Sequence, residues 1–436
     1  MPRRTTAAAR LARLGFADPA RAERLLAEVP ALADGGPDPG VIDAFAFAAD
    51  PDLALTALTR IPDDGEMIAA LRADPGLRTR LFAVLGASAA LGDHLARHPG
   101  HWRVLRDGEG LSPPEPGEVR AGLLAAVGAR PADAEPVASQ AASPDPAADP
   151  VVALRVAYRR RLLPLAARDL TGAAPLDQVA SELADLAAAV LEAALAIARA
   201  ALGADAAPCR LAVIAMGKCG ARELNYASDV DVIFVAEPGD AAAADGEAAA
   251  LRTATQLAAG LIRVCSQSTP EGSLFPVDPN LRPEGRNGPL VRTLASHRAY
   301  YDRWAQTWEF QALLKARPVA GDAALGHAYV AAMGPLVWQA AQRDNFVSDV
   351  QAMRRRVIGT LPPAVAGREL KLGPGGLRDI EFAVQLLQLV HGRADESLRD
   401  PATLPALAAL AAGGYVGRHD AADLAAAYRF LRRQRG

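Results

Sequence analysis

Two carboxylates begin a short apolar run in the middle of the chain. Asp229 and Asp231 flank Val230, and apolar residues continue as far as Val235. The run predicts a buried strand over residues 228–235, and residues i and i+2 of a strand point to the same face. Two like charges held this close repel each other and raise a pKa unless a cation neutralises them. Hard oxygen ligands of this kind suit Mg²⁺, or Mn²⁺, that also contacts substrate phosphates.

An Asp-x-Asp pair alone is more often a solvated strand end, and its neighbours are what favour a metal and phosphate site. Gly217 and Lys218 lie upstream, where a glycine turn can present N–H groups and one ammonium to phosphate. Asp278 could add a third carboxylate from a neighbouring strand, and Arg282 follows a proline that keeps its segment extended. Ser228 either binds phosphate or caps the start of the strand, and capping is slightly favoured.

The elements that position these residues are predicted from periodicity. Residues 211–216 form an apolar run bounded by turn residues, which predicts another buried strand. Two long helices are expected at about 151–170 and 176–202, the second amphipathic enough to pack on a sheet. Together with the strand carrying Asp278, these elements form the pattern of a nucleotidyltransferase palm. We therefore expect an α+β fold, in which a mostly helical chain carries a mixed β-sheet palm of nucleotidyltransferase type and flanking helical domains.

Composition and hydrophobic spacing suggest the following division of the chain. The expected parts are an all-α region at 1–130, a Pro/Ala/Asp-rich linker at 131–150, a catalytic domain at 151–330 with its palm from about 208 to 290, and a C-terminal helical domain at 331–436. The last residues have the pattern of an unfinished helix, so we expect the C-terminal domain to be truncated.

The overall composition excludes several classes of protein. With 436 residues, 51% of them hydrophobic, the chain can bury a sizeable core. A formal net charge of -3 argues against broad electrostatic binding to nucleic acid or to an anionic membrane. Cys209, Cys219 and Cys265 form no CxxC pair, which predicts free thiols and a cytoplasmic protein. No segment has the pattern of an export signal or a membrane span.

Three other features are expected to be structural. His94, His98 and His101 are spaced like one helix face, but Pro99 interrupts that helix, so we expect a packed helix end and no metal site. Trp304 and Trp308 are expected to be core residues of a single helix. Lysine is scarce, since only Lys218, Lys315 and Lys371 occur among 47 basic residues. A site that holds one phosphate oxygen closely can require an ammonium, although chance placement explains the three lysines about as well.

Several ordered blocks resemble one family. Residues 217–231 are similar to the active-site block of the glutamine synthetase adenylyltransferase/deadenylylase family. Further blocks agree in order, at residues 277–283, 288–290, 300–309, 314–322 and 371–382. Family members carry two related catalytic halves, and this chain resembles the N-terminal, deadenylylating half.

The resemblance implies a reaction and a set of site residues. Inorganic phosphate would attack the α-phosphorus of an adenylylated tyrosine of glutamine synthetase and release ADP. Asp229, Asp231 and Asp278 would be catalytic residues that hold Mg²⁺. The implied phosphate- and nucleotide-binding residues are Gly217, Lys218, Ser228, Arg282, Lys315 and Arg317. The implied partners are glutamine synthetase, the PII signalling protein, phosphate, and ATP or ADP.

Other functions stay open at this point. The same carboxylates could support adenylylation of glutamine synthetase by ATP, or the chain could be a non-catalytic regulatory fragment. The related uridylyltransferase of the PII protein is a weaker alternative, because the blocks beyond the palm are expected to fit it poorly.

Overall fold

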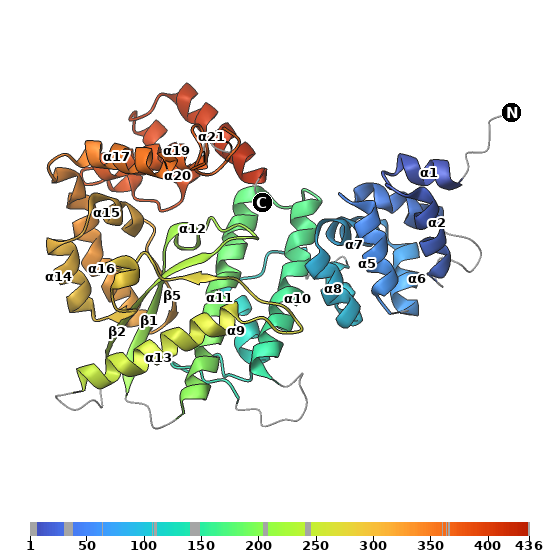
Figure 1. Ribbon diagram of the computed structural model, residues 1–436, viewed down its shortest axis with the longest axis horizontal. Helices are drawn as coiled ribbons and strands as arrows, with labels where there is room; N and C mark the ends of the chain where they lie inside the picture. The colour runs from blue at the N-terminus through green and yellow to red at the C-terminus, as the bar shows by residue number, and fades with distance from the viewer. Residues whose placement is uncertain are drawn as a thin grey trace. The chain divides into compact units, whose positions relative to one another are not determined.

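The chain folds into two compact units. The computed structural model describes residues 7–29, 38–62, 64–106, 108, 111–139, 149–203, 208–239, 246–359, 361–362, 364 and 367–434, so most of the second half of the predicted linker, 140–148, lies outside the described residues. The first unit comprises Met1–Glu115 and Arg155–Val179, and the second comprises Pro116–Leu154 and Ala180–Gly436. The described part is mostly helical and contains one small sheet, which confirms the predicted α+β class (Figure 1).

The first unit is all-helical over its described residues. Its elements are α1 (Ala7–Arg13), α2 (Pro19–Glu28), α4 (Pro39–Asp43), η1 (Ala44–Phe47), α5 (Pro51–Arg60), α6 (Gly65–Ala73), α7 (Pro75–Ala87), α8 (Ala89–Arg97), η2 (Pro99–Leu105) and most of α10 (Pro150–Leu170). Aspartates cap several of these helices, as where Asp50 accepts from the backbone N–H of Leu53 and a proline follows it. Phe45 and Phe82 meet edge to face in the core, with ring centroids 4.4 Å apart.

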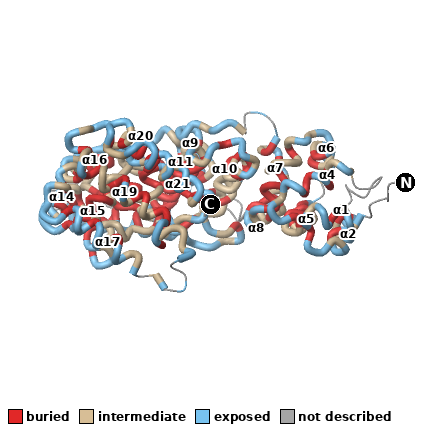
Figure 2. The backbone as a smooth tube through the Cα atoms, turned by 90° about the horizontal axis from the view of Figure 1, so that it is seen from above, coloured by how far each residue is buried: buried red, intermediate tan, exposed pale blue. Residues whose placement is uncertain are grey.

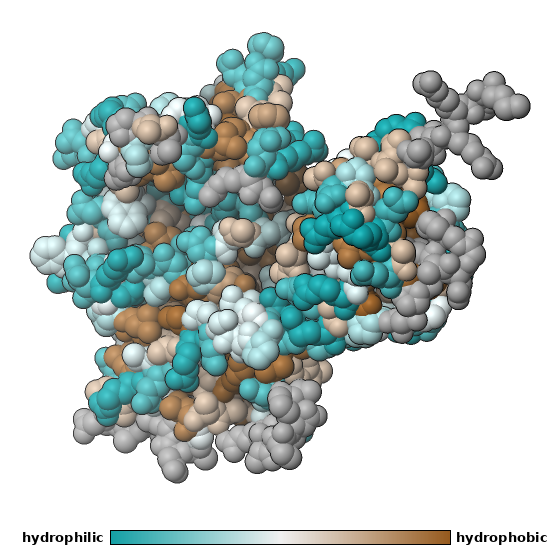
Figure 3. Space-filling view, turned by 45° about the vertical axis from the view of Figure 1, so that its right-hand side comes forward, coloured by the Kyte–Doolittle hydropathy of each residue, from teal (hydrophilic) through white to brown (hydrophobic). Residues whose placement is uncertain are grey.

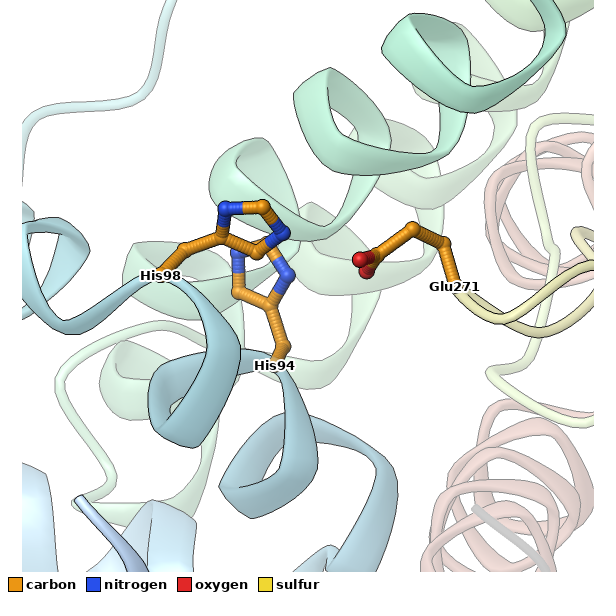
Figure 4. Close-up of side chains that lie close together, drawn as sticks. All are labelled: His94, His98 and Glu271. Carbon is orange, nitrogen blue, oxygen red and sulfur yellow. The ribbon is translucent and has the colours of Figure 1, made fainter. Parts of the chain in front are cut away.

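The three predicted helix-end histidines lie where α8 gives way to η2. Helix α8 ends at Arg97 and η2 begins at Pro99, which confirms the interruption (Figure 4, where Glu271 of the second unit is also drawn). His94 is fully buried, and its Nε2 lies 2.9 Å from Nδ1 of His101. Burial, together with His101 and His98, lowers the pKa of His94 to about 3, so the ring is neutral at pH 7.

The second unit is built on a five-stranded mixed sheet. Its strands are β1 (Cys209–Ala215), β2 (Val230–Pro238), β3 (Val277–Asp278), β4 (Val291–Arg292) and β5 (Arg317–Gly321). Strand β1 pairs antiparallel with β2 and β5, and β2 pairs in parallel with β3 and β4. The predicted strand at 211–216 is β1. The other predicted strand starts at Val230 and not at residue 228, so Asp229 belongs to the preceding loop.

The second unit also contains helices before, between and after these strands. They are α9 (Pro116–Ala126), α11 (Leu176–Leu202), α12 (Gly217–Gly220), α13 (Glu247–Ser266), α14 (Leu294–Arg303), α15 (Thr307–Leu313), α16 (Ala323–Gln339), α17 (Phe346–Gly359), α19 (Leu377–His391), α20 (Thr403–Ala412) and α21 (Arg418–Arg433). Alternate residues of the central strands, such as Ile214 and Ile233, form one core with Leu325, Tyr329 and Met333 of α16. Figure 2 shows the buried residues of these helices in red.

Three further predictions concern membrane spans, cysteines and tryptophans. Hydrophilic and hydrophobic residues are interspersed on the face seen in Figure 3, and no described helix combines the length and apolar character that a membrane span requires. All three cysteines are free, as predicted. The prediction of a tryptophan pair in one helix is wrong, because α14 ends before Trp304 and α15 begins after it, which leaves the Trp304 side chain 71% exposed.

Candidate active site

The three predicted carboxylates lie together at one edge of the sheet. Asp231 is in β2 and pairs in register with Asp278 of the parallel strand β3, while Asp229 immediately precedes β2. Carboxylate oxygens of the three residues lie within 4.8 Å of one another. Two short parallel strands therefore bring a residue from almost fifty positions downstream beside the Asp-x-Asp pair.

The three negatively charged carboxylates of this cluster repel one another. Burial raises the pKa of Asp231 to about 6, and the neighbouring charges of Asp229 and Asp278 add to the rise. The positive charges of Lys371 and Arg378 act in the opposite direction on the same carboxyl. A divalent cation would remove the repulsion among the three acids, and a set made only of carboxylate oxygens fits Mg²⁺ or Mn²⁺.

Gly217 allows the turn after β1 to approach this cluster. Its φ angle is +53°, a conformation that L side chains rarely adopt. A β-carbon at this position would also lie 2.3 Å from Oδ2 of Asp231. Gly220 is equally constrained, because a β-carbon there would lie 1.8 Å from the carbonyl oxygen of Lys315. The glycine turn thus fits closely between the carboxylate of Asp231 and the backbone just before β5.

A cavity of about 270 Å³ opens beside the carboxylates. The palm, α15, α17 and α19 all contribute to its walls, through Gly217, Lys218, Ser228, Asp229, Asp231, Leu281, Trp308, Gln311, Ala312, Lys315, Met353, Val357, Lys371, Arg378, Glu381, Phe382 and Gln385. Six of the nine predicted site residues are in this lining. The other three, Asp278, Arg282 and Arg317, are not.

Both lysines predicted to bind phosphate have polar partners at the cavity. Nζ of Lys218 donates to Oδ1 of Asn225 at 2.7 Å. Nζ of Lys315 lies 3.0 Å from Oε2 of Glu223, and both side chains are buried. Glu223 therefore supplies a buried counter-charge for Lys315.

The two predicted arginines hold backbone in place. Arg282 donates from Nη1 to the carbonyl oxygen of Pro279 at 2.9 Å and from Nη2 to that of Gly288 at 3.1 Å, which closes the loop between β3 and β4. Arg317 donates to the carbonyl oxygens of Cys219, at 2.9 Å, and Gly220, at 3.1 Å. These contacts fix the loops on either side of the carboxylates.

Several lining residues were not predicted to belong to the site. Trp308 and Gln311 come from α15, and Arg378, Phe382 and Gln385 come from α19. The only sequence signal for them is that most fall in or next to the blocks at 300–309 and 371–382. Nothing in local periodicity indicates that α15 and α19 face the same cavity.

Glu223 also connects the site to the C-terminal helices. Its carboxylate accepts from the backbone N–H of Thr403 at 2.8 Å and from the hydroxyl of Tyr428 at 3.3 Å. Its carbonyl oxygen accepts from Nη2 of Arg432 at 2.9 Å. The loop between α12 and β2 is thus bonded to α20 and α21 through one residue.

Comparison with known proteins adds the following similarities. A family model described as glutamate-ammonia ligase adenylyltransferase matches residues 78–332, and one described as GlnD PII-uridylyltransferase matches residues 349–436. The second match includes the block at residues 371–382, so the expectation of a poor fit to the uridylyltransferase is wrong for this block; the blocks at 277–322 lie within the first match.

Curated relatives cover nearly the whole chain. The bifunctional glutamine synthetase adenylyltransferase/adenylyl-removing enzyme of Streptomyces avermitilis is 59% identical over 99% of this chain and 41% of its own length. The protein of the same name from Streptomyces coelicolor is 58% identical over 99% of the chain and 42% of its own length. That of Mycobacterium tuberculosis is 50% identical over 96% and 40%. The chain thus spans about two fifths of the length of these relatives.

Proposed function

The chain belongs to the glutamate-ammonia ligase adenylyltransferase family, and on that premise we propose that it is a metal-dependent nucleotidyltransferase acting on glutamine synthetase. In this proposal it removes AMP from an adenylylated tyrosine by phosphorolysis. The names of the relatives include both an adenylyltransferase and an adenylyl-removing activity, and the resemblance of the chain to the N-terminal half of the family favours removal.

One observation supports the proposal above all others. Asp229, Asp231 and Asp278 place carboxylate oxygens within 4.8 Å of one another, and the first two line the same cavity as Lys218. The three acids would hold Mg²⁺ there. When bound, the ion withdraws charge from the transferred phosphoryl group and stabilises the leaving oxygen.

The proposed reaction exchanges one phosphorus–oxygen bond for another. An oxygen of inorganic phosphate bonds to the α-phosphorus of the adenylyl group, and the bond from that phosphorus to the tyrosyl oxygen breaks. ADP forms, and the tyrosyl oxygen leaves as a phenolate that takes up a proton. A phenol with a pKa of about 10 is a favourable leaving group.

The residues of the chain reduce the repulsion between the two anions. Lys218, Lys371 and Arg378 all line the cavity, and the last two lie close enough to Asp231 to lower its pKa. Fixed cations of this kind stabilise charge that develops during phosphoryl transfer. The PII signalling protein is the proposed regulator, and the similarity of residues 349–436 to a PII-uridylyltransferase model supports that assignment.

The test is a direct assay of AMP removal. The full chain is incubated with adenylylated glutamine synthetase, Mg²⁺ and phosphate, and ADP is measured. Release of ADP is expected, with a loss of at least about a hundredfold in Asp229→Asn. Asp302→Asn, which changes an exposed acid on α14, serves as the matched control and should keep the activity.

Either of two results would assign a different function to the chain. If no ADP forms, but ATP and unmodified glutamine synthetase yield adenylylated product, the chain works in the forward direction. If neither reaction occurs while the chain still binds glutamine synthetase, it is a regulatory module.

A further inference from the structure

Two buried glutamines form an amide pair in the wall of the cavity. Gln311 lies on α15 and Gln385 on α19, and both residues line the cavity although they are 4% and 6% exposed. Nε2 of Gln311 donates to Oε1 of Gln385 at 2.7 Å. Burying two primary amides is costly unless their polar atoms find partners.

The pair leaves part of its hydrogen-bonding capacity unused. Oε1 of Gln311 is buried and has no hydrogen-bond partner in the described part of the chain. In the structure this hydrogen bond uses the nitrogen of Gln311 and the oxygen of Gln385. The pair therefore offers an acceptor from Gln311 next to a donor from Gln385.

The lining of the cavity also includes large apolar side chains. Trp308 and Phe382 contribute aromatic rings, and Leu281, Met353 and Val357 contribute aliphatic side chains. Lys218 and the carboxylates of Asp229 and Asp231 line the same cavity. Aromatic and aliphatic walls with a few fixed polar groups suit a flat heterocycle, and cations with a metal site suit the phosphates attached to it.

We propose that Gln311 and Gln385 select the nucleobase, and that they select adenine. The Watson–Crick edge of adenine has a donor, the 6-amino group, next to an acceptor, N1. These match the acceptor of Gln311 and the donor of Gln385. Hypoxanthine and guanine present the reverse pattern, an oxygen at position 6 and a hydrogen on N1, so both contacts are mismatched. This inference rests on the proposed function, because it assigns the specificity of the same site.

Nucleotide binding by the full chain tests the assignment. ADP and IDP, which differ at position 6 and N1 of the base, are titrated in the presence of Mg²⁺ by calorimetry. The wild-type chain is expected to bind ADP at least about tenfold more tightly than IDP, the ratio that corresponds to one buried hydrogen bond. In Gln311→Met and in Gln385→Met the preference should fall to near unity, mainly through weaker binding of ADP.

The control and the contrary outcomes separate this inference from the function. Gln339→Met, an exposed glutamine at the end of α16, should keep the wild-type preference. Equal binding of ADP and IDP by the wild type, or tighter binding of IDP, overturns the assignment of the two glutamines but leaves the proposed function standing. Failure to bind either nucleotide overturns both. The wild-type comparison stays decisive even if a variant does not fold.

Discussion

A β-carbon at position 217 would lie 2.3 Å from Oδ2 of Asp231, so only glycine fits between the turn after β1 and this carboxylate. The backbone of Gly217, just after β1, thus lies directly beside a proposed metal ligand in the antiparallel strand β2. It makes the geometry of the carboxylates dependent on a residue that has no side chain of its own.

Gly217→Ala should therefore disturb the site as well as the fold. The positive φ angle of +53° is expected to cost about 1–3 kcal/mol of stability with alanine, and the methyl group must displace Asp231. We expect weaker Mg²⁺ binding and a large loss of activity, measured by calorimetry and by the ADP assay. Gly334→Ala, where a β-carbon would meet nothing within 4 Å, is the matched control. Wild-type metal binding in Gly217→Ala would contradict the prediction.

The stability of the metal-free chain should depend on the ionisation of Asp231. Its pKa rises from 3.8 to about 6 on folding, so the folded chain holds the proton more tightly than the unfolded chain does. This contribution is fully present below pH 4 and is lost as the pH rises through about 6, at a cost of up to about 3 kcal/mol. Urea denaturation at a series of pH values should show the loss in the wild type, and the difference should vanish in Asp231→Asn.

Mg²⁺ should compete with this proton. Because the metal needs the carboxylate, its affinity should fall about tenfold for each pH unit below about 6 and level off above it. Calorimetric titrations at pH 5 and pH 7.5 measure the change. An affinity that is constant between these values would argue against Asp231 as a ligand.

Glu223→Gln should loosen the C-terminal helices. Although burial opposes its ionisation, Lys315 and Arg432 hold the pKa of Glu223 below its usual value, so the carboxylate is charged. Removing the charge leaves Lys315 buried without its counter-charge, which typically costs about 3–5 kcal/mol. Denaturation should show that loss, and hydrogen exchange should speed up in α20.

An exposed ion pair provides the control for Glu223. Glu396→Gln breaks the pair with Arg399, in which the side chain of Glu396 is 80% exposed, and should cost less than about 1 kcal/mol. If both variants lose similar stability, the pair at the site has no special structural role.

His297 should make the second unit sensitive to acid. Burial lowers the pKa of His297 to about 3, whereas histidine in the unfolded chain binds a proton below about pH 6.5. Stability is therefore expected to fall by about 1.4 kcal/mol per pH unit as the pH drops below 6.5. His297→Phe should reduce this slope because phenylalanine does not titrate. His419→Phe, at a position where the side chain is 91% exposed, should leave the slope unchanged. Equal slopes in all three proteins would count against a buried neutral His297.

Much of the palm could be predicted from local patterns. The apolar runs around β1 and β2 have the lengths that strands require, and the two-residue spacing of Asp229 and Asp231 keeps their carboxylates close together. Gly217 was expected at a turn, and it adopts the positive φ that glycine permits. These features depend on residues close in sequence, which is why periodicity and turn chemistry are sufficient to find them.

The assignments of the arginines required the tertiary structure. A sequence shows that Arg282 and Arg317 are cations near the motif, but not that their donors are taken up by backbone carbonyls. Likewise, Lys315 was expected to meet phosphate, and its nearest described partner is Glu223. The partner of a long flexible side chain depends on which loops meet it, and this is fixed only when the whole chain packs.

The sequence by itself indicated that Asp229 and Asp231 could share a cation, because residues two positions apart stay close together even though only Asp231 lies in β2. The tertiary structure decided where the cavity ends and what lines it. Gln311 and Gln385 are 74 residues apart and meet only because α15 and α19 pack side by side. Such a contact arises from the burial of two helix faces against each other, and no spacing within either helix specifies its partner.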